Sequence, residues 1–417
     1  MSIVRPFKGI KPKRELVNKV ASLPYDVMNR AEAKALAEGN AYSFLHVVRS
    51  EIDLDDSVSP YDETVYKKAR TNLDQMIKDG VLLQDEKPMF YIYRQIMNGR
   101  VQTGIVGSTS IDDYMNNVIK KHEYTRPKKE VDRINNFDYC DANTAPIFLT
   151  YRKNNKINSI INDWIKFHMP IYDFKSEDDI THIVWELSSE ALVEEINEIF
   201  ENEVDSLYIA DGHHRSASSV KVGLKRREEN KNFTGDEEYN YFMSVMFPDE
   251  DLFIMDYNRV VHTLNGLSFD EFMKKVKEKF EVEKTESHEA FRPKDKHTFG
   301  MYIENNWYKI SAKEGIFDAK DPVDRLDVAI LQNNILAPLL GIEDPRTSEN
   351  IDFVGGIRGL KELEEKVNNG KKVAFSMYPT TMDDLLAIAD AGKVMPPKST
   401  WFEPKLRSGL FVHRLID

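Results

Sequence analysis

The chain has 417 residues, of which 41% are hydrophobic and 30% are charged, and its formal net charge at pH 7 is −13. This length predicts two or three domains or one large composite domain, and the acidic balance disfavours non-specific binding to nucleic acid, which needs a basic surface. The single cysteine, Cys140, excludes a disulfide framework within the chain and a cysteine-based zinc site.

The N-terminus, MSIVRPFKGIKPKRE, lacks the apolar core of a signal peptide, and no apolar run approaches the length of about eighteen residues that a membrane span needs. We therefore expect a cytoplasmic protein with neither a membrane nor a nucleic acid as partner. Association of the chain with itself into a homo-oligomer is left open.

The first third of the chain predicts two helices and a hairpin. One helix is expected over residues 30–38, before the Gly39-Asn40 stop signal, and a second in DETVYKKARTNLDQMIKDG, where apolar residues recur at helical spacing up to Gly80. Two β-rich runs flank Asn98-Gly99, a strong hairpin signal.

The middle third predicts short strands in APIFLTYR, THIVWELS and SLYIAD, with EALVEEINEIFE as the helix between the last two. This strand–helix–strand order favours a parallel pairing of those two strands. The segment YNYFMSVMFPDEDLFIMDYNRVV predicts a hairpin that turns at residues 248–251.

The last third predicts a hairpin in HTFGMYIENNWYKISA, a buried helix in LDVAILQNNILAPLLG and a strand in KVAFSMYPT. The expected fold class is therefore α/β in the mixed α+β sense. We expect three parts: an N-terminal α/β segment over 1–105, a core over 106–265, and a C-terminal α/β segment over 266–417 that packs back on the core.

The stretch LYIADGHHRSASS, residues 207–219, places an aspartate, a glycine, two histidines and an arginine in succession. Such side chains serve binding or catalysis, and a folding argument alone would not select them. The stretch predicts a strand that ends at Asp211 and a helix that follows, so the residues DGHHR lie where helical N–H groups favour anions. We expect Gly212, His213, His214, Arg215 and Ser216 to bind phosphate, because glycine permits close approach and arginine offers a bidentate fork. Asp211 is expected to hold Mg²⁺ against those phosphates.

Two other interpretations of this stretch compete with a phosphate site. Asp211 can act as a simple N-cap with surface histidines beside it, but a cap requires one of these residues rather than five. Zinc is disfavoured, because adjacent histidines seldom converge on one metal and no third ligand follows at a suitable spacing.

A second group of charged residues, KKHEYTRP, precedes a proline that discourages helix at Arg126, so a loop is expected there. A glutamate beside His122 and Arg126 suits a general base with an anion clamp, although a solvated charge run is the simpler interpretation. From Lys128 onward the sequence is compatible with an ordinary helix linked by salt bridges.

A third group lies in MPPKSTWFEPKLRSGLFVH, where aromatic anchors alternate with donors. We expect this tail to fold back on a domain and to roof a pocket, with His122, Lys398 and Arg407 as weaker candidates for substrate binding. The glycines of IDFVGGIRG are interpreted as a structural turn. No P-loop, dinucleotide fingerprint, HExxH or GxSxG pattern occurs.

Several stretches together resemble the bacterial domain-of-unknown-function 1015 family. They run from Arg5 to Phe411 and include RPFKGIKP, LPYDV, VIKKHEYTRPKKEVDR, IADGHHRSASS, DPRTSENIDFVGGIRG and MPPKSTWFEPKLRSGLF. An HE loop followed later by a strand ending in DGHHR is also similar to the ParB/sulfiredoxin-like superfamily, whose free-serine kinase branch uses this arrangement.

That second resemblance implies a ParB/sulfiredoxin-like, nucleotide-binding core over 106–265. The two motifs lie 211 − 123 = 88 residues apart, so the core would contain an insertion. His213 replaces the cysteine of the sulfiredoxin branch, which disfavours sulfinic acid repair, and no basic recognition helix supports a ParB-like role.

By this resemblance, Glu123 would be the general base, Asp211 and His213 would share the catalytic site, and the turn with Arg126 would bind ATP or ADP. The expected function is a nucleotide-dependent phosphotransferase that acts on a small hydroxyl metabolite, with free L-serine as the candidate substrate. The alternative is a nucleotide-binding regulatory protein without catalysis. A phosphodiester hydrolase is disfavoured by the charge of −13.

Overall fold

A computed structural model describes residues 2–125, 127–286 and 289–416 of the chain. It confirms the mixed α+β class, and within these ranges the chain forms two compact units. The first unit contains the described residues of 1–121, 125–252 and 404–417, and the second contains 122–124 and 253–403. The three-part division expected from the sequence stays a prediction.

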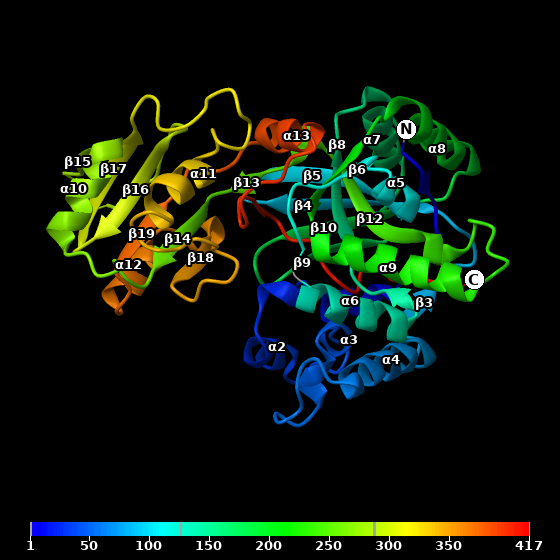
Figure 1. Cartoon of the computed structure of the whole chain (residues 1–417). Helices are drawn as coiled ribbons and strands as arrows, with labels where there is room; N and C mark the ends of the chain where they lie inside the picture. Colours follow the sequence, from blue (N-terminus) through cyan, green and yellow to red (C-terminus); the bar gives the residue numbers. More distant parts are fainter. Residues whose placement is uncertain (1, 126, 287–288, 417) are drawn as a thin grey trace. The chain divides into compact units, whose positions relative to one another are not determined.

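The first unit contains the longest sheet of the described residues and most of their helices (Figure 1). Its strands are β1 (Val4–Arg5), β2 (Ile10–Pro12), β3 (Leu82–Gln84), β4 (Phe90–Met97), β5 (Arg100–Ser110), β6 (Ile119–Lys120), β7 (Ala142–Asn143), β8 (Ile147–Tyr151), β9 (Tyr172–Lys175), β10 (Thr181–Leu187), β11 (Leu207–Asp211), β12 (Tyr241–Pro248) and β21 (His413–Arg414). Its helices are α1 (Val17–Val20), α2 (Arg30–Ala37), α3 (Leu45–Val48), α4 (Glu63–Lys78), α5 (Ile111–Met115), α6 (Pro127–Cys140), α7 (Asn155–Phe167), α8 (Glu190–Glu203) and α9 (His213–Glu229).

The main sheet has the strand order β6-β11-β8-β12-β5-β4-β10-β9, with β1 added to β5. The pairs β6–β11 and β8–β12 are parallel, and the other pairs are antiparallel. The predicted hairpin at Asn98-Gly99 is confirmed, since Met97 faces Arg100 and both turn residues have positive φ angles of 52° and 78°.

Two topological predictions are wrong. Strands β10 and β11 are not neighbours, because β8, β12, β5 and β4 lie between them in the sheet. The run around residues 248–251 is not a hairpin either: β12 pairs in the main sheet, whereas β14 (Tyr257–Val261) pairs in the sheet of the second unit. The local sequence predicts which segments form strands, but it does not specify which distant strand supplies the hydrogen-bond partners.

The helices of the first unit begin where the sequence provides caps and apolar spacing. Asp62 accepts the N–H of Thr64 at 2.9 Å and starts α4, whose buried face includes Val65 and Leu73. Helices α7 and α8 contribute to the core on the main sheet, while α6 runs beside α9 (Figure 1). Of the predicted helices, α2 and α4 begin at side-chain caps, whereas α8 begins without one.

The second unit is built on an antiparallel sheet in the order β15-β17-β16-β19-β14-β18. Its strands are β13 (Ile254–Met255), β14, β15 (Phe280–Lys284), β16 (Thr298–Ile303), β17 (Asn306–Ala312), β18 (Ile351–Gly355), β19 (Val373–Ser376) and β20 (Trp401–Phe402). Its helices are α10 (Phe269–Lys279), α11 (Asp327–Leu331), α12 (Lys361–Asn368) and α13 (Met382–Asp390). The predicted hairpin in HTFGMYIENNWYKISA is confirmed as β16–β17.

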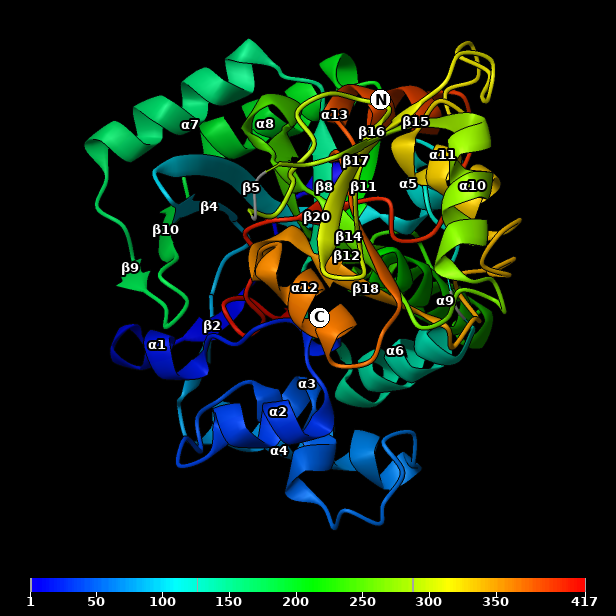
Figure 2. The same ribbon diagram turned by 90° about the vertical axis from the view of Figure 1, so that its left-hand side faces the viewer.

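Residues after Pro404 return to the first unit and are held there by backbone pairs. Ser408 exchanges hydrogen bonds with Ser22 at 3.0 and 2.9 Å, and β21 pairs with β7. Figure 2 shows the first-unit helices α2, α3 and α4 gathered together. No helix among the described residues is long and apolar enough to cross a bilayer.

Candidate functional site

The DGHHR turn lies at one end of the main sheet, where two parallel strands end together. Strand β6 pairs in parallel with β11, with Tyr208 opposite Lys120. The carboxyl ends of parallel neighbours meet at the same sheet edge, so the chain leaves β6 after Lys120 on the side where β11 delivers Asp211. The sheet thus brings Lys120, which precedes the HE motif, to the edge where β11 ends at Asp211.

Gly212 gives the turn its shape. It is the N-cap of α9 with φ = 101°, a conformation that side chains rarely adopt. A Cβ at this position would lie 3.1 Å from Nε and 3.2 Å from Cζ of Arg215. Glycine is therefore required both for the backbone angle and for the guanidinium group that folds back over it.

Asp211 is held by two cations. Its Oδ2 accepts a hydrogen bond from Lys405 Nζ at 2.8 Å, and its Oδ1 lies 3.7 Å from Nη2 of Arg215. Burial acts to raise the pKa of Asp211, but Lys405 and then Arg215 outweigh it and hold that pKa well below its usual range. The carboxylate is thus ionised at neutral pH.

Arg215 points into the protein rather than into solvent. The residue is 3% exposed, and its Nη1 donates to the carbonyl of Pro146. Its Nε has no hydrogen-bond partner among the described residues. A buried guanidinium with an unused donor beside a glycine turn is a candidate for binding an anion, because an unpaired buried N–H is unfavourable.

The other residues of the turn belong to the first turn of α9. His213 and Ser216 are buried, and Ser216 Oγ donates to the carbonyl of Gly212 at 3.0 Å. His214 is partly exposed. The predicted strand-to-helix turn is therefore confirmed, although the assignment of phosphate contacts to these side chains stays a prediction.

The segment that follows the HE loop lies against α9. Glu130 on α6 accepts the hydroxyl of Thr125 at 2.6 Å and is paired with Lys221 on α9. Ser218 of α9 donates to the carbonyl of Glu130 at 2.9 Å. Thr125 and Glu130 are thus fixed beside the helix that the DGHHR turn begins.

The remaining predicted site residues lie in different places. His122 and Glu123 belong to the second unit, where the carbonyl of His122 accepts the N–H of Met395 at 2.8 Å. Lys398 also belongs to that unit, and its carbonyl accepts from Arg259 at 2.9 Å. Arg126 lies outside the described residues. A site shared by Glu123 and Asp211 therefore stays a prediction.

Arg407, the second tail residue expected to bind substrate, is buried in a polar network of the first unit. Its guanidinium is paired with Asp178, donates to Ser176 at 3.1 Å and lies 3.3 Å from Nε2 of His182. His182 also contacts the hydroxyl of Tyr93 at 2.7 Å, and burial lowers its pKa to about 3. This network ties the C-terminal segment to β10.

The described residues contain no group of three or more His, Cys, Asp or Glu side chains that could hold a metal ion. Asp211 supplies one carboxylate, already paired with two cations. These residues do not fit a resident metal centre. They fit Mg²⁺ only as it occurs with nucleotides, where one or two carboxylates act together with phosphate oxygens and water.

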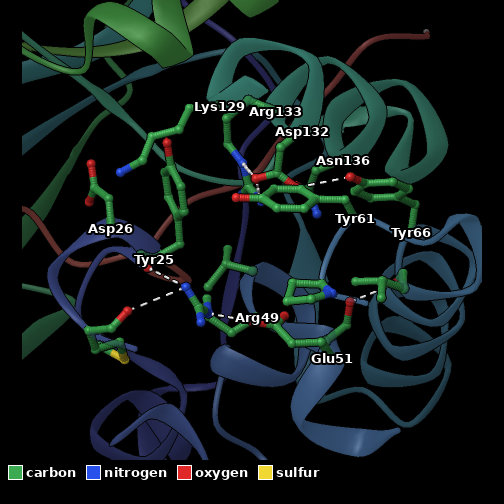
Figure 3. A pocket seen from close by; sticks show the side chains of 15 residues that line it. Tyr25, Asp26, Arg49, Glu51, Tyr61, Tyr66, Lys129, Asp132, Arg133 and Asn136 are labelled. Carbon is green, nitrogen blue, oxygen red and sulfur yellow. Dashed lines mark hydrogen bonds and ion pairs between the residues drawn. The ribbon is translucent and has the colours of Figure 1, made fainter. Parts of the chain in front are cut away.

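A cavity of about 180 Å³ lies in the first unit between α6 and the LPYDV segment (Figure 3). Burial raises the pKa of the Tyr25 hydroxyl, whereas Arg133 of the cavity and Arg215 of the turn both act to lower it. The guanidinium carbon of Arg133 lies 3.9 Å from the centre of the Tyr25 ring. Helix α6, which supplies this wall of the cavity, packs along α9, the helix that the DGHHR turn begins.

Sequence reasoning missed Lys405 and Tyr25. Lys405 was one donor among several in the tail, and nothing in its neighbourhood distinguishes it from Lys398. Lys405 is held beside the main sheet by Gln95 of β4, whose Nε2 donates to the carbonyl of Lys405 at 3.0 Å. Tyr25 lies in LPYDV, which contributed only to the family resemblance.

Comparison with solved structures gives several similar chains. A conserved hypothetical protein from Pyrococcus furiosus has a TM-score of 0.37 and 15% identity, covering 74% of this chain and 95% of its own. A free serine kinase in complex with AMP has 0.36 and 14%, covering 72% and 86%. A C-terminally truncated SbnI from Staphylococcus aureus has 0.41 and 11%, covering 74% and 87%.

With TM-scores below 0.5, none of these structures establishes an activity for this chain. Comparison with the curated proteins gives no match. The family model described as "Protein of unknown function (DUF1015)" matches residues 4–329. Because this match covers well over half of the sequence, the chain belongs to the DUF1015 family.

Proposed function

We propose that this protein is a nucleotide-dependent phosphotransferase that acts on a small hydroxyl metabolite, with free L-serine as the candidate substrate. The observation that carries the proposal is the turn at Gly212, with φ = 101°, beneath the buried guanidinium of Arg215. A glycine turn at a helix N-terminus with a cationic group beside it is the kind of site that binds phosphates.

The residues of the turn divide into two roles. Gly212 and the first N–H groups of α9 are suited to approach phosphate oxygens, and Arg215 and Lys405 supply positive charge beside them. Asp211 is the carboxylate available to a nucleotide-bound Mg²⁺, which would neutralise phosphate charge when bound. Phosphoryl transfer requires little else from the protein than such positioning and charge.

In the proposed reaction the terminal phosphorus–oxygen bond of ATP or ADP breaks and a new bond forms between that phosphorus and the hydroxyl oxygen of serine. The products are O-phosphoserine and ADP or AMP. The hydroxyl proton must pass to a base, and we assign this role to Glu123, which follows His122 in the motif that resembles the free-serine kinase branch.

The experiment measures O-phosphoserine formed from L-serine and Mg²⁺ with ATP or with ADP. Glu123→Gln keeps the shape of the side chain and removes its basicity, so turnover is expected to fall by about two to four decades while nucleotide affinity persists. Glu314→Gln, an exposed residue of the second unit, is the matched control and should leave turnover unchanged.

Normal turnover in Glu123→Gln would remove that residue from the chemistry. Nucleotide binding without phosphoserine from either donor would instead establish the alternative, a nucleotide-binding regulatory protein. Absence of both binding and turnover would refute the phosphate site itself.

A further inference from the structure

The cavity between α6 and the LPYDV segment is lined by charged and aromatic side chains of the first unit. Figure 3 shows Lys129, Asp132 and Arg133 on one side, from α6, with Arg49 and Glu51 on the other. Tyr25 and Tyr61 also line the cavity. Its α6 wall belongs to the helix that packs along α9, and its charged and aromatic lining suits a small polar ligand.

Arg133 supplies to this cavity a buried donor that has no acceptor among the described residues. The residue is 5% exposed and its guanidinium carbon lies 3.9 Å from the centre of the Tyr25 ring. Nε and Nη2 donate to Asp132 at 3.0 and 2.8 Å, whereas Nη1 has no hydrogen-bond partner among the described residues. A buried guanidinium nitrogen of this kind is suited to an acceptor, above all a carboxylate.

Three other charged groups of the lining, Arg49, Glu51 and Asp132, have hydrogen-bond or ion-pair partners within the first unit. Arg49 donates to the carbonyls of Tyr25 and Met28 at 3.1 and 3.3 Å and lies 2.7 Å from Glu51. Asp132 also accepts the hydroxyl of Tyr66 at 3.0 Å. These bonds hold Arg49, Glu51 and Asp132 in the cavity wall, and none of them engages the buried Nη1 of Arg133.

The formal charges of the lining balance. They are Arg49, Lys129 and Arg133 against Asp26, Glu51 and Asp132. A ligand with net negative charge, such as a phosphate, would add an unbalanced charge to this partly enclosed site, and a fully apolar ligand would leave Arg133 unpaired. A zwitterion satisfies both conditions, because its carboxylate can meet Arg133 while its ammonium group faces the carboxylates of the other walls.

We propose that this cavity binds a small free α-amino acid, with Arg133 Nη1 donating to its carboxylate and Tyr61 closing over it at the solvent side. Tyr61 lines the cavity while remaining 56% exposed, as a residue at an entrance does. The further statement that this amino acid is the phosphoryl acceptor rests on the proposed function. The binding of an amino acid in this cavity is independent of that function.

The experiment is calorimetric titration of the full chain without nucleotide, using L-alanine, L-serine, ethanolamine and L-lactate as probes. L-alanine and L-serine are expected to bind. Ethanolamine, which lacks the carboxylate, and L-lactate, which lacks the ammonium group, should bind at least tenfold more weakly. Failure of both amino acids to bind, or equal binding of ethanolamine or lactate, would overturn the inference.

Variants assign the binding to this cavity. Arg133→Lys keeps the charge but loses the planar donor, so L-alanine affinity should fall at least tenfold, while Arg226→Lys, on α9 and paired with Asp138 and Asp141 instead, should leave it unchanged. If Arg133→Lys fails to fold, the exposed Tyr61→Ala tests the same cavity, with an expected severalfold loss. Unchanged L-alanine affinity in the folded variants refutes the site.

The outcomes separate the two proposals. Amino acid binding that depends on Arg133, without any phosphoserine formed, would refute the phosphotransferase and leave this site intact. If the protein forms phosphoserine but Arg133→Lys leaves its affinity for amino acids unchanged, the phosphotransferase stands and the amino acid site in this cavity is refuted.

Discussion

Gly212 shows how one residue adapts the backbone to a site. Two separate features disfavour any other residue at this position. The backbone has φ = 101°, and a Cβ would lie 3.1 Å from Nε of Arg215. Asp211 and Lys405 depend on the same turn, because the carboxylate at the end of β11 meets an ammonium group that arrives 194 residues later in the chain.

Gly212→Ala is expected to destabilise the first unit by about 2–3 kcal/mol, since a strained backbone angle and displacement of the Arg215 guanidinium add together. Gly39→Ala is the control, because Gly39 has φ = 71° but nothing within 4 Å of a Cβ, so it should cost about 1 kcal/mol. Urea unfolding measures both. Equal losses would show that crowding against Arg215 contributes nothing.

Lys405→Met is expected to lower stability at pH 7 by about 1–3 kcal/mol, because Asp211 loses its closest cation in a partly buried pair. A carboxyl whose folded pKa is depressed contributes stability above its unfolded pKa, and this contribution disappears as pH falls through the folded pKa. The difference from wild type should therefore narrow at pH 3 and below.

Unfolding of both proteins in urea at pH 7 and pH 3 checks this pH dependence, with Lys405→Arg as the charge-preserving control. A loss of the same size at both pH values would mean that Lys405 acts through its aliphatic stem rather than its charge.

The position of helix α9 depends on the absence of a side chain at Gly223. A Cβ on Gly223 would lie 2.4 Å from the carbonyl of Tyr239 and 2.7 Å from Cδ1 of Ile111. The helix therefore approaches these neighbours more closely than any other residue would permit. On its other side, Glu130 and Ser218 join it to α6, which carries Arg133 into the cavity.

Gly223→Ala is expected to destabilise the protein by about 2–4 kcal/mol, even though alanine improves intrinsic helix propensity by about 1 kcal/mol, because backbone on the facing segment must move. Glu228→Ala, an exposed site on the same helix, should change stability by less than about 0.5 kcal/mol. Thermal and urea unfolding decide. A stabilised Gly223→Ala would show that α9 can shift away at no cost.

At the scale of the whole molecule, the two units have separate cores. The core on the main sheet includes Ile92, Ile105 and Phe242, while a cluster of the second unit includes Val260 and Leu363. Units with their own cores unfold as separate cooperative steps unless their interface is large and apolar. We expect calorimetry of the full chain to resolve two transitions.

Asp327 gives the second unit its own pH dependence. The residue is 7% exposed, its Oδ1 accepts the N–H of His297 at 2.7 Å, and its Oδ2 has no hydrogen-bond partner among the described residues. Burial raises the pKa of this carboxyl to about 7, with the nearby Asp384 adding to the rise and Lys296 opposing it. A folded pKa above the unfolded one means that the folded unit binds more protons between these values, so its stability falls as pH rises from about 4 to 7.

Asp327→Asn should remove this pH dependence and stabilise the second unit at pH 8 by about 2 kcal/mol, because a neutral amide retains the acceptor without a buried charge. Calorimetry between pH 5 and 8 should show one transition that depends on Asp327 and a different one that responds to Gly223→Ala. Displacement of a single common transition by both substitutions would show that the units unfold together.

The sequence by itself determined the features whose cause is local. Hairpins at Asn98-Gly99 and in HTFGMYIENNWYKISA follow from turn chemistry. Helices α2 and α4 follow from apolar period and caps, and α8 follows from apolar period alone. The DGHHR turn follows from an apolar run that ends in polar residues and a glycine. The family resemblance likewise followed from short sequence motifs, each of which can be recognised without knowing which other segments it contacts in the fold.

Only the tertiary structure decided which distant segments meet. Three features all depend on long-range packing: β11 pairs with β6 and β8 rather than β10, Lys405 reaches Asp211, and Arg133 lines a cavity with a buried Nη1 that has no partner among the described residues. Alternation and periodicity specify which face of an element is buried, but many partners satisfy that requirement equally well. The choice among them belongs to the free energy of the whole packed chain, which no local pattern of residues encodes.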